Sequence, residues 1–139
     1  MGTLLVYGRV VGQKDVSKNV RDFLARFIDS VELLEVLLLA RAAPEKAWST
    51  KDVARALTLS DESADLRLRQ LAGRGLLAAD IKGGTFTYSP ESADMDKTID
   101  DVAETYAKRR TTVIGLIFSG PSPSVRGFAD AFRLRDEDE

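Results

Sequence analysis

The chain has neither cysteine nor histidine among its 139 residues, and this double absence excludes several classes of function. Without thiols there can be no disulfide, no cysteine nucleophile and no zinc site built from cysteine and histidine. Without imidazole the chain lacks the side chain that enzymes use most often for acid–base catalysis. Carboxylates could still act, but no isolated carboxylate pair stands in an apolar setting. We therefore expect a binding protein with no enzymatic activity, no cofactor and no metal site.

Long apolar runs and an excess of positive charge are also missing. The longest candidate span, residues 113–118, is far shorter than the roughly 20 residues that cross a membrane. The apolar start, residues 1–12, lacks the basic beginning and long apolar run of a signal peptide, so we expect a cytoplasmic protein with no membrane partner. A formal net charge of −2 excludes a strongly basic coat for unspecific nucleic-acid binding, although a local basic face remains allowed.

What the chain does have is enough apolar content, 44%, to build one hydrophobic core. We predict a single domain over residues 1–139. Apolar residues at spacings of three and four predict a helix over 15–29, with Asp15 as its N-cap, and a second helix that ends before Pro44. The same spacing predicts one long helix over about 92–118, and terminal helical segments that together extend over 92–134.

The central region, about residues 31–89, carries the densest set of local signals. Two short helices are predicted, 50–57 behind an N-cap at Ser49 and 60–74 behind an N-cap at Ser60. Gly75 suits the left-handed position that ends a helix, and two short strands then flank the turn Lys82-Gly83-Gly84. The buried side of the second helix is predicted to be Ala64, Leu68 and Leu71.

This succession of helix, tight turn, helix and hairpin resembles the winged helix-turn-helix superfamily, especially MarR-like bacterial transcription regulators. The resemblance is carried by the runs STKDVARAL (residues 49–57), LS (59–60) and LRQLAGRGLL (68–77), and by the glycine pair 83–84. It covers about residues 31–89. The fold class that it implies is mainly α with a small β-hairpin, a winged helix-turn-helix flanked by long N- and C-terminal helices.

In that family, as the resemblance implies, helix 60–74 would lie in the major groove of double-stranded DNA and the hairpin would lie beside the backbone. Ser49, Thr50 or Lys51 would meet a phosphate at a helix N-terminus. The residues predicted to contact DNA or another partner are Ser49, Thr50, Lys51, Glu62, Ser63, Leu66, Arg67, Arg69, Gln70, Arg74 and Lys82.

The charge of this region leaves two functions open. Over residues 49–89 there are six basic side chains against five acidic ones, and three of the acids open helix 60–74. Phosphates favour a more basic face, whereas carboxylates at this place also suit the helix dipole. The leading hypothesis is a dimeric, DNA-binding transcriptional regulator. The alternative is a winged-helix module that binds a protein and no DNA, with Leu66 as an apolar anchor.

The terminal helices, 15–29 and 92–134, are predicted to be dimerisation elements, because their apolar stripes are too extensive for lone surface helices. The alternative is that helix 92–118 packs on the first helices of its own chain. The residues predicted at a homodimer interface are Phe23, Phe27, Ile99, Val102, Tyr106, Val113, Ile117, Phe128 and Phe132.

Overall fold

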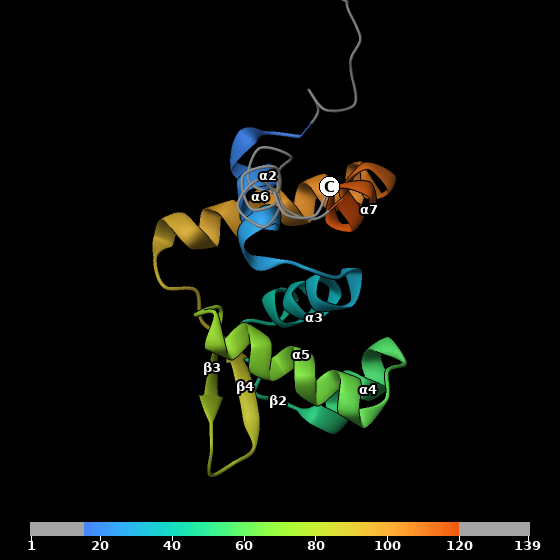
Figure 1. Ribbon diagram of the computed structural model, residues 1–139. Helices are drawn as coiled ribbons and strands as arrows, with labels where there is room; N and C mark the ends of the chain where they lie inside the picture. The colour runs from blue at the N-terminus through green and yellow to red at the C-terminus, as the bar shows by residue number, and fades with distance from the viewer. Residues whose placement is uncertain (1–15, 120–139) are drawn as a thin grey trace, which may run out of the picture.

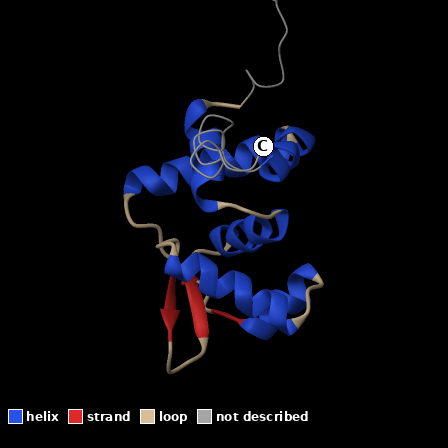
Figure 2. Ribbon diagram, in the orientation of Figure 1, coloured by secondary structure: helices blue, strands red, loops and turns tan. Residues whose placement is uncertain are grey.

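The computed structural model describes residues 16–119, which form helices and one small sheet. The elements, labelled as in Figure 1, are α2 (Lys18–Phe27), α3 (Val31–Ala42), β2 (Trp48–Ser49), α4 (Thr50–Leu57), α5 (Asp61–Gly73), β3 (Leu77–Asp80), β4 (Thr85–Tyr88), α6 (Ala93–Lys108) and α7 (Arg110–Ser119). Most of the described residues are helical, and the strands lie together at one end of the molecule (Figure 2).

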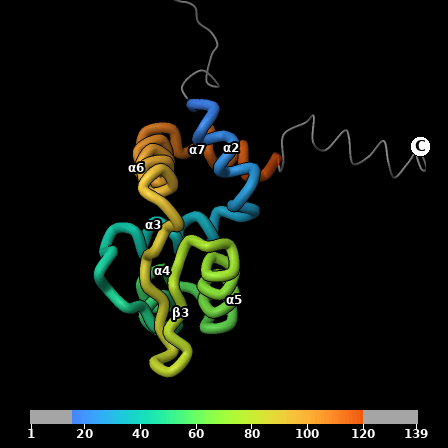
Figure 3. Tube along the Cα trace, turned by 90° about the vertical axis from the view of Figure 1, so that its left-hand side faces the viewer, coloured from blue at the N-terminus to red at the C-terminus, as the bar shows by residue number. Residues whose placement is uncertain are grey.

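The helices form two groups with α3 between them. Two views at right angles place α2, α6 and α7 at one end of the molecule, and α4, α5 and the strands at the other (Figures 1 and 3). α3 is apolar around most of its circumference because it meets both groups: Leu33, Leu34, Val36 and Leu37 are at most 1% exposed. A single core therefore joins the two ends.

Five serines decide where five helices begin. Ser17, Ser30, Ser49, Ser60 and Ser92 precede α2 to α6, and each hydroxyl accepts a hydrogen bond from the backbone N–H three residues on, at 3.0 to 3.2 Å. Such caps satisfy backbone donors that have no partner within the helix. The predicted caps at Ser49 and Ser60 are confirmed. The predicted cap of the first helix at Asp15 is wrong, because the helix begins at Lys18 and Ser17 directly precedes it.

The sheet has three antiparallel strands in the order β2-β4-β3, of which β3 and β4 form the hairpin. Leu77 is opposite Tyr88 and Asp80 is opposite Thr85, so the turn lies at residues 81–84 and includes Ile81 besides the predicted Lys82-Gly83-Gly84. Trp48 of β2 pairs with Phe86 and is buried, which adds a strand to the predicted hairpin. Gly75, at φ +82°, turns the chain out of α5 into this sheet. β2 has only two residues and pairs with one edge of β4.

The predicted long helix over 92–118 is wrong in one respect: it is two helices, α6 and α7, separated at Arg109. Arg109 leaves the helical conformation, with φ −131° and ψ 50°. Beyond this break α7 packs against α2, where Val113 and Ile117 are buried.

The architecture is a winged helix-turn-helix flanked by helices from both ends of the chain, and the predicted fold class is confirmed. α4, the connection at Thr58 and α5 form the helix-turn-helix, and β3 and β4 form the wing. Thr58 adopts a left-handed conformation, φ 57° and ψ 51°, that reverses the chain between the two helices. That all 139 residues make one domain stays a prediction, as do the parts of the terminal helices beyond residues 16–119.

Polar contacts fix α6 against both the wing and α3. The Tyr88 hydroxyl on β4 donates to Asp96 at 2.6 Å, and the Tyr106 hydroxyl donates to Glu35 on α3 at 2.9 Å. Arg41 of α3 also pairs with Asp100. Burial, and then the hydrogen bond to a carboxylate, raises the pKa of both tyrosine hydroxyls above the ordinary value of 10.0.

These shifts predict a loss of stability in alkali. Since the folded pKa of Tyr88 is raised, its contribution is complete below the unfolded pKa, about 10, and falls as the pH rises above it. Tyr88→Phe should therefore cost about 1 kcal/mol of unfolding free energy near neutrality. Urea titrations at several pH values should show this difference shrinking above about pH 10. A difference that stays constant with pH would contradict the assignment.

Candidate nucleic-acid interface

The outward face of α5 is the surface that sequence reasoning assigned to partner contact. Ala64, Leu68 and Leu71 face the core at 0% exposure, as predicted. On the opposite side Leu66 is 47% exposed, and Glu62 and Arg69 are also exposed. α5 thus presents a negative, an apolar and a positive side chain in succession along one exposed side.

Two exposed cations of this region, one on α4 and one on α5, are paired with neighbouring carboxylates. Lys51 at the start of α4 lies 3.0 Å from Asp61, and Arg69 lies 2.8 Å from Asp65 one turn earlier on α5. The lysine and arginine side chains are 74% and 72% exposed. Ion pairs this open to water contribute about 0–1 kcal/mol, so an incoming phosphate can exchange with the carboxylate at little cost.

Lys82 lies at the tip of the wing, where the turn is held by Asp80. The backbone N–H of Gly84 donates to the Asp80 carbonyl at 2.8 Å, and the N–H of Gly83 donates to the Asp80 carboxylate at 3.2 Å. Lys82 itself makes no ion pair or hydrogen bond with any residue from 16 to 119. The turn lies at the far end of the molecule (Figure 1), and Lys82 within it is an exposed cation without a partner among residues 16–119.

Three other predicted contact residues are engaged in holding the fold together. Arg67 donates to Glu32 of α3 at 2.9 Å and to Gln70 at 3.0 Å, and its side chain is only 20% exposed. Arg74 donates to the carbonyl of Phe27 at 2.6 Å and to Asp29. Because these contacts join α5 to α3 and to the segment before α3, Arg67, Gln70 and Arg74 act as structural residues in this conformation.

We expect Arg67→Ala to lower stability instead of partner affinity. The partly buried pair with Glu32 would leave an uncompensated carboxylate, so the free energy of unfolding should fall by about 1–2 kcal/mol. Urea unfolding of Arg67→Ala, Glu32→Ala and the double variant measures the coupling directly. Additive effects of the two single changes would show that the pair contributes nothing.

The hydroxyls at the start of the two helices are already in use. Ser49 caps α4 while the Asp52 carboxylate accepts from the Ser49 N–H at 3.3 Å, and this backbone hydrogen bond lowers the pKa of Asp52. The Thr50 hydroxyl lies 3.5 Å from Asp65. Ser63 is half-buried in the first turn of α5, where its N–H is bonded to Ser60. A phosphate here would meet Lys51 first.

The side chains predicted at a homodimer interface lie inside a single chain. Phe23, Ile99, Val102, Tyr106, Val113 and Ile117 are at most 8% exposed, and α2, α6 and α7 bury them against one another. Phe27 is half-buried, with its ring centroid 4.9 Å from that of Phe23. Phe128 and Phe132 lie outside the described residues. The homodimer stays a prediction, but these six buried side chains cannot be its contact surface in this conformation.

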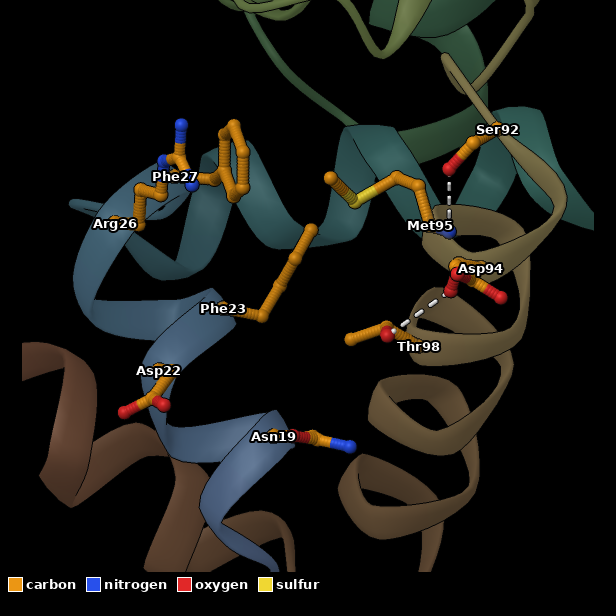
Figure 4. Close-up of a pocket in the computed structure, with 9 residues that line it drawn as sticks. All are labelled: Asn19, Asp22, Phe23, Arg26, Phe27, Ser92, Asp94, Met95 and Thr98. Atoms are coloured by element: carbon orange, nitrogen blue, oxygen red, sulfur yellow. Dashed lines mark hydrogen bonds between the residues drawn. The ribbon is translucent and has the colours of Figure 1, made fainter.

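A cleft of about 250 Å³ separates α2 from the first turns of α6 (Figure 4). Phe23, Phe27 and Met95 supply its apolar walls, and Asp22, Asp94, Arg26 and other polar residues line the rest. Figure 4 shows Met95 and the two phenylalanines turned toward the space between the helices. Residues 16–119 hold no cluster of three or more Asp and Glu side chains that could bind a metal ion.

No family model matches the chain, and no curated protein matches its sequence. Among solved structures it is similar to MepR, a transcription regulator of the Staphylococcus aureus multidrug efflux pump MepA, at 16% identity. That likeness covers 89% of this chain and 85% of the other, with a TM-score of 0.47. Two mutants of S. aureus MepR are similar at 14% identity over 88% of this chain, with TM-scores of 0.47 and 0.46.

Two exposed apolar side chains were missed by the sequence reasoning. Ile81 at the wing tip is 93% exposed, and Phe118 at the end of α7 is 80% exposed. The exposure of Ile81 could have been predicted from its position beside the glycine turn, because a hairpin tip has no neighbouring element to cover a side chain. Phe118 was missed because residues 92–118 were predicted to form one helix. None of the helices between residues 16 and 119 is both long and apolar enough to cross a bilayer.

Proposed function

We propose that this protein is a transcriptional regulator that binds double-stranded DNA through α4, α5 and the wing. The observation that carries the proposal is the placement of Lys51, Arg69 and Lys82. These exposed cations stand on three successive elements at one end of the molecule, and none is tied to the core. Cations so placed suit the two strands of phosphate that border a major groove.

The ion pairs also reduce the repulsion between phosphates and the carboxylates at the start of α5. Asp61 and Asp65 would repel phosphates if they stood alone, but each has its own cation, at 3.0 and 2.8 Å. The pairs therefore lower the repulsion that an approaching phosphate meets, and Asp61 and Asp65 repel it only where Lys51 or Arg69 exchanges to the phosphate. A face that is close to neutral overall binds unspecific DNA weakly, so we expect affinity to depend on the right base sequence.

We further propose that the protein acts as a cytoplasmic homodimer without enzymatic activity. A two-fold dimer would set two copies of α5 about one DNA turn apart, near 34 Å, and would favour a palindromic site. Since six of the predicted interface residues are buried in one chain, we propose that the contact uses Phe118 and the exposed part of Phe27. Sedimentation of Phe118→Asp against the unchanged protein tests this surface.

The test of DNA binding is enrichment from genomic fragments followed by titration of the enriched duplex at increasing salt. We expect the logarithm of the association constant to fall linearly with the logarithm of salt concentration, because phosphate contacts release counterions. Single-stranded DNA of the same sequence is the control and should bind more weakly. Absence of any retained duplex at low salt would refute the proposal.

Exposed Leu66 and Ile81 favour a second candidate, a winged-helix module that binds a protein. Both lie on the α5 and wing end of the molecule, and isolated apolar side chains there could anchor a partner. Leu66→Asp tests the protein-binding module, and its fold should survive because the position is half-exposed. A defined partner lost on this change, together with no DNA binding by the unchanged protein, would favour the module.

A further inference from the structure

The outward face of α5 holds one carboxylate that its neighbours do not neutralise. Asp61 is paired with Lys51 and Asp65 with Arg69, but Glu62 has no ion pair or hydrogen bond with any residue from 16 to 119. One turn further along, Leu66 is 47% exposed on the same face. Leu66 lies outside the core, and Glu62 makes no cap hydrogen bond, although its charge in the first turn of α5 suits the helix dipole.

We propose that Glu62 and Leu66 are the specificity-determining pair of the DNA-binding face, and that they select a cytosine and a thymine in the major groove. This inference rests on the proposed function. It gives Glu62 and Leu66, which do not bind phosphate, a role in contacting the edges of the bases.

An ionised carboxylate accepts hydrogen bonds and donates none. In the major groove, guanine presents two acceptors and thymine presents one, so Glu62 is repelled by both. Adenine offers an amino donor but has the N7 acceptor beside it. Cytosine alone offers its N4 amino group without an adjacent acceptor on the same base, and it is therefore the base that suits Glu62.

The apolar group that the major groove offers is the C5 methyl of thymine. Leu66 can cover that methyl and remove it from water, which no polar side chain of α5 would do as well. Residues four apart on a helix are separated by about 6 Å along its axis. Because base pairs repeat about every 3.4 Å, the cytosine and the thymine should lie within about two steps of each other.

The experiment selects duplexes from a random library with the unchanged protein, with Glu62→Gln and with Leu66→Ala. The unchanged protein should enrich a site that contains the cytosine and the thymine. Glu62→Gln should shift the first position toward adenine, because an amide pairs with both N6 and N7, and should weaken binding to the cytosine site roughly tenfold. Glu104→Gln on α6 is the matched control and should leave the selected site unchanged.

Replacing the selected thymine by uracil removes only the methyl group. The unchanged protein should lose roughly fourfold in affinity, the value of one buried methyl, whereas Leu66→Ala should bind both duplexes alike. Equal binding of thymine and uracil sites by the unchanged protein, or a cytosine preference that survives Glu62→Gln, would overturn the inference while DNA binding itself stands. If no duplex is enriched at all, the proposed function fails and the inference falls with it.

Discussion

Replacing Lys51, Arg69 and Lys82 together by alanine is expected to lower DNA affinity by roughly two to three orders of magnitude near 0.1 M salt. Each cation is exposed and stands at the α4–α5–wing end of the molecule, so each can release a condensed counterion on meeting a phosphate. The slope of affinity against salt should become shallower by about one for each lost contact. Gel retardation of the selected duplex at several salt concentrations measures both quantities.

The control is a second triple variant with the same change in net charge. Lys18, Lys97 and Lys108 are exposed on α2 and α6, at the other end of the molecule. Their replacement by alanine should leave affinity and salt slope nearly unchanged. If both triple variants lose affinity alike, net charge and not the placement of the cations governs binding, and the assigned face is wrong.

Leu68→Ala is expected to remove a large part of the folding stability, about 2–5 kcal/mol. Leu68 is 0% exposed on α5, which packs against both α3 and α4. The cavity would stand between the helix-turn-helix and the central helix, so the loss is a substantial share of the roughly 5–15 kcal/mol that holds a small domain folded. Urea or thermal unfolding followed by circular dichroism measures it.

Leu66→Ala is the matched control, with the same change of side chain two residues away on the same helix. Leu66 is 47% exposed, so its removal should alter the free energy of unfolding by less than about 1 kcal/mol. Similar losses for Leu66 and Leu68 would contradict the orientation of α5 on which the whole interface depends.

Much of the winged-helix core could be predicted because its signals are local. A serine cap acts on an amide three residues away, and Gly75 and the glycine turn act on their own backbone. The buried face of α5 follows from a period of 3.6 residues. These features depend on residues close together in the sequence, so the helix-turn-helix and the wing could be predicted without any distant contact.

The remainder depends on contacts between residues far apart in the chain. Arg67 and Glu32 are 35 positions apart, and Arg74 and Phe27 are 47 apart, so their pairing could not be read from spacing. Sequence reasoning therefore treated Arg67 and Arg74 as surface cations. The break at Arg109 was likewise not predicted, and beyond it α7 packs against α2, which is distant in the chain.

The central claim, that α4, α5 and the wing bind duplex DNA, is tested most directly by mapping amide shifts in the NMR spectrum while the selected duplex is added. We predict shifts concentrated around Lys51, along α5 from Glu62 to Arg69, and at the wing tip around Lys82. Amides of α2, α6 and α7 away from the helix-turn-helix should change little. Shifts confined to those three helices, or no shifts with any duplex, would contradict the claim.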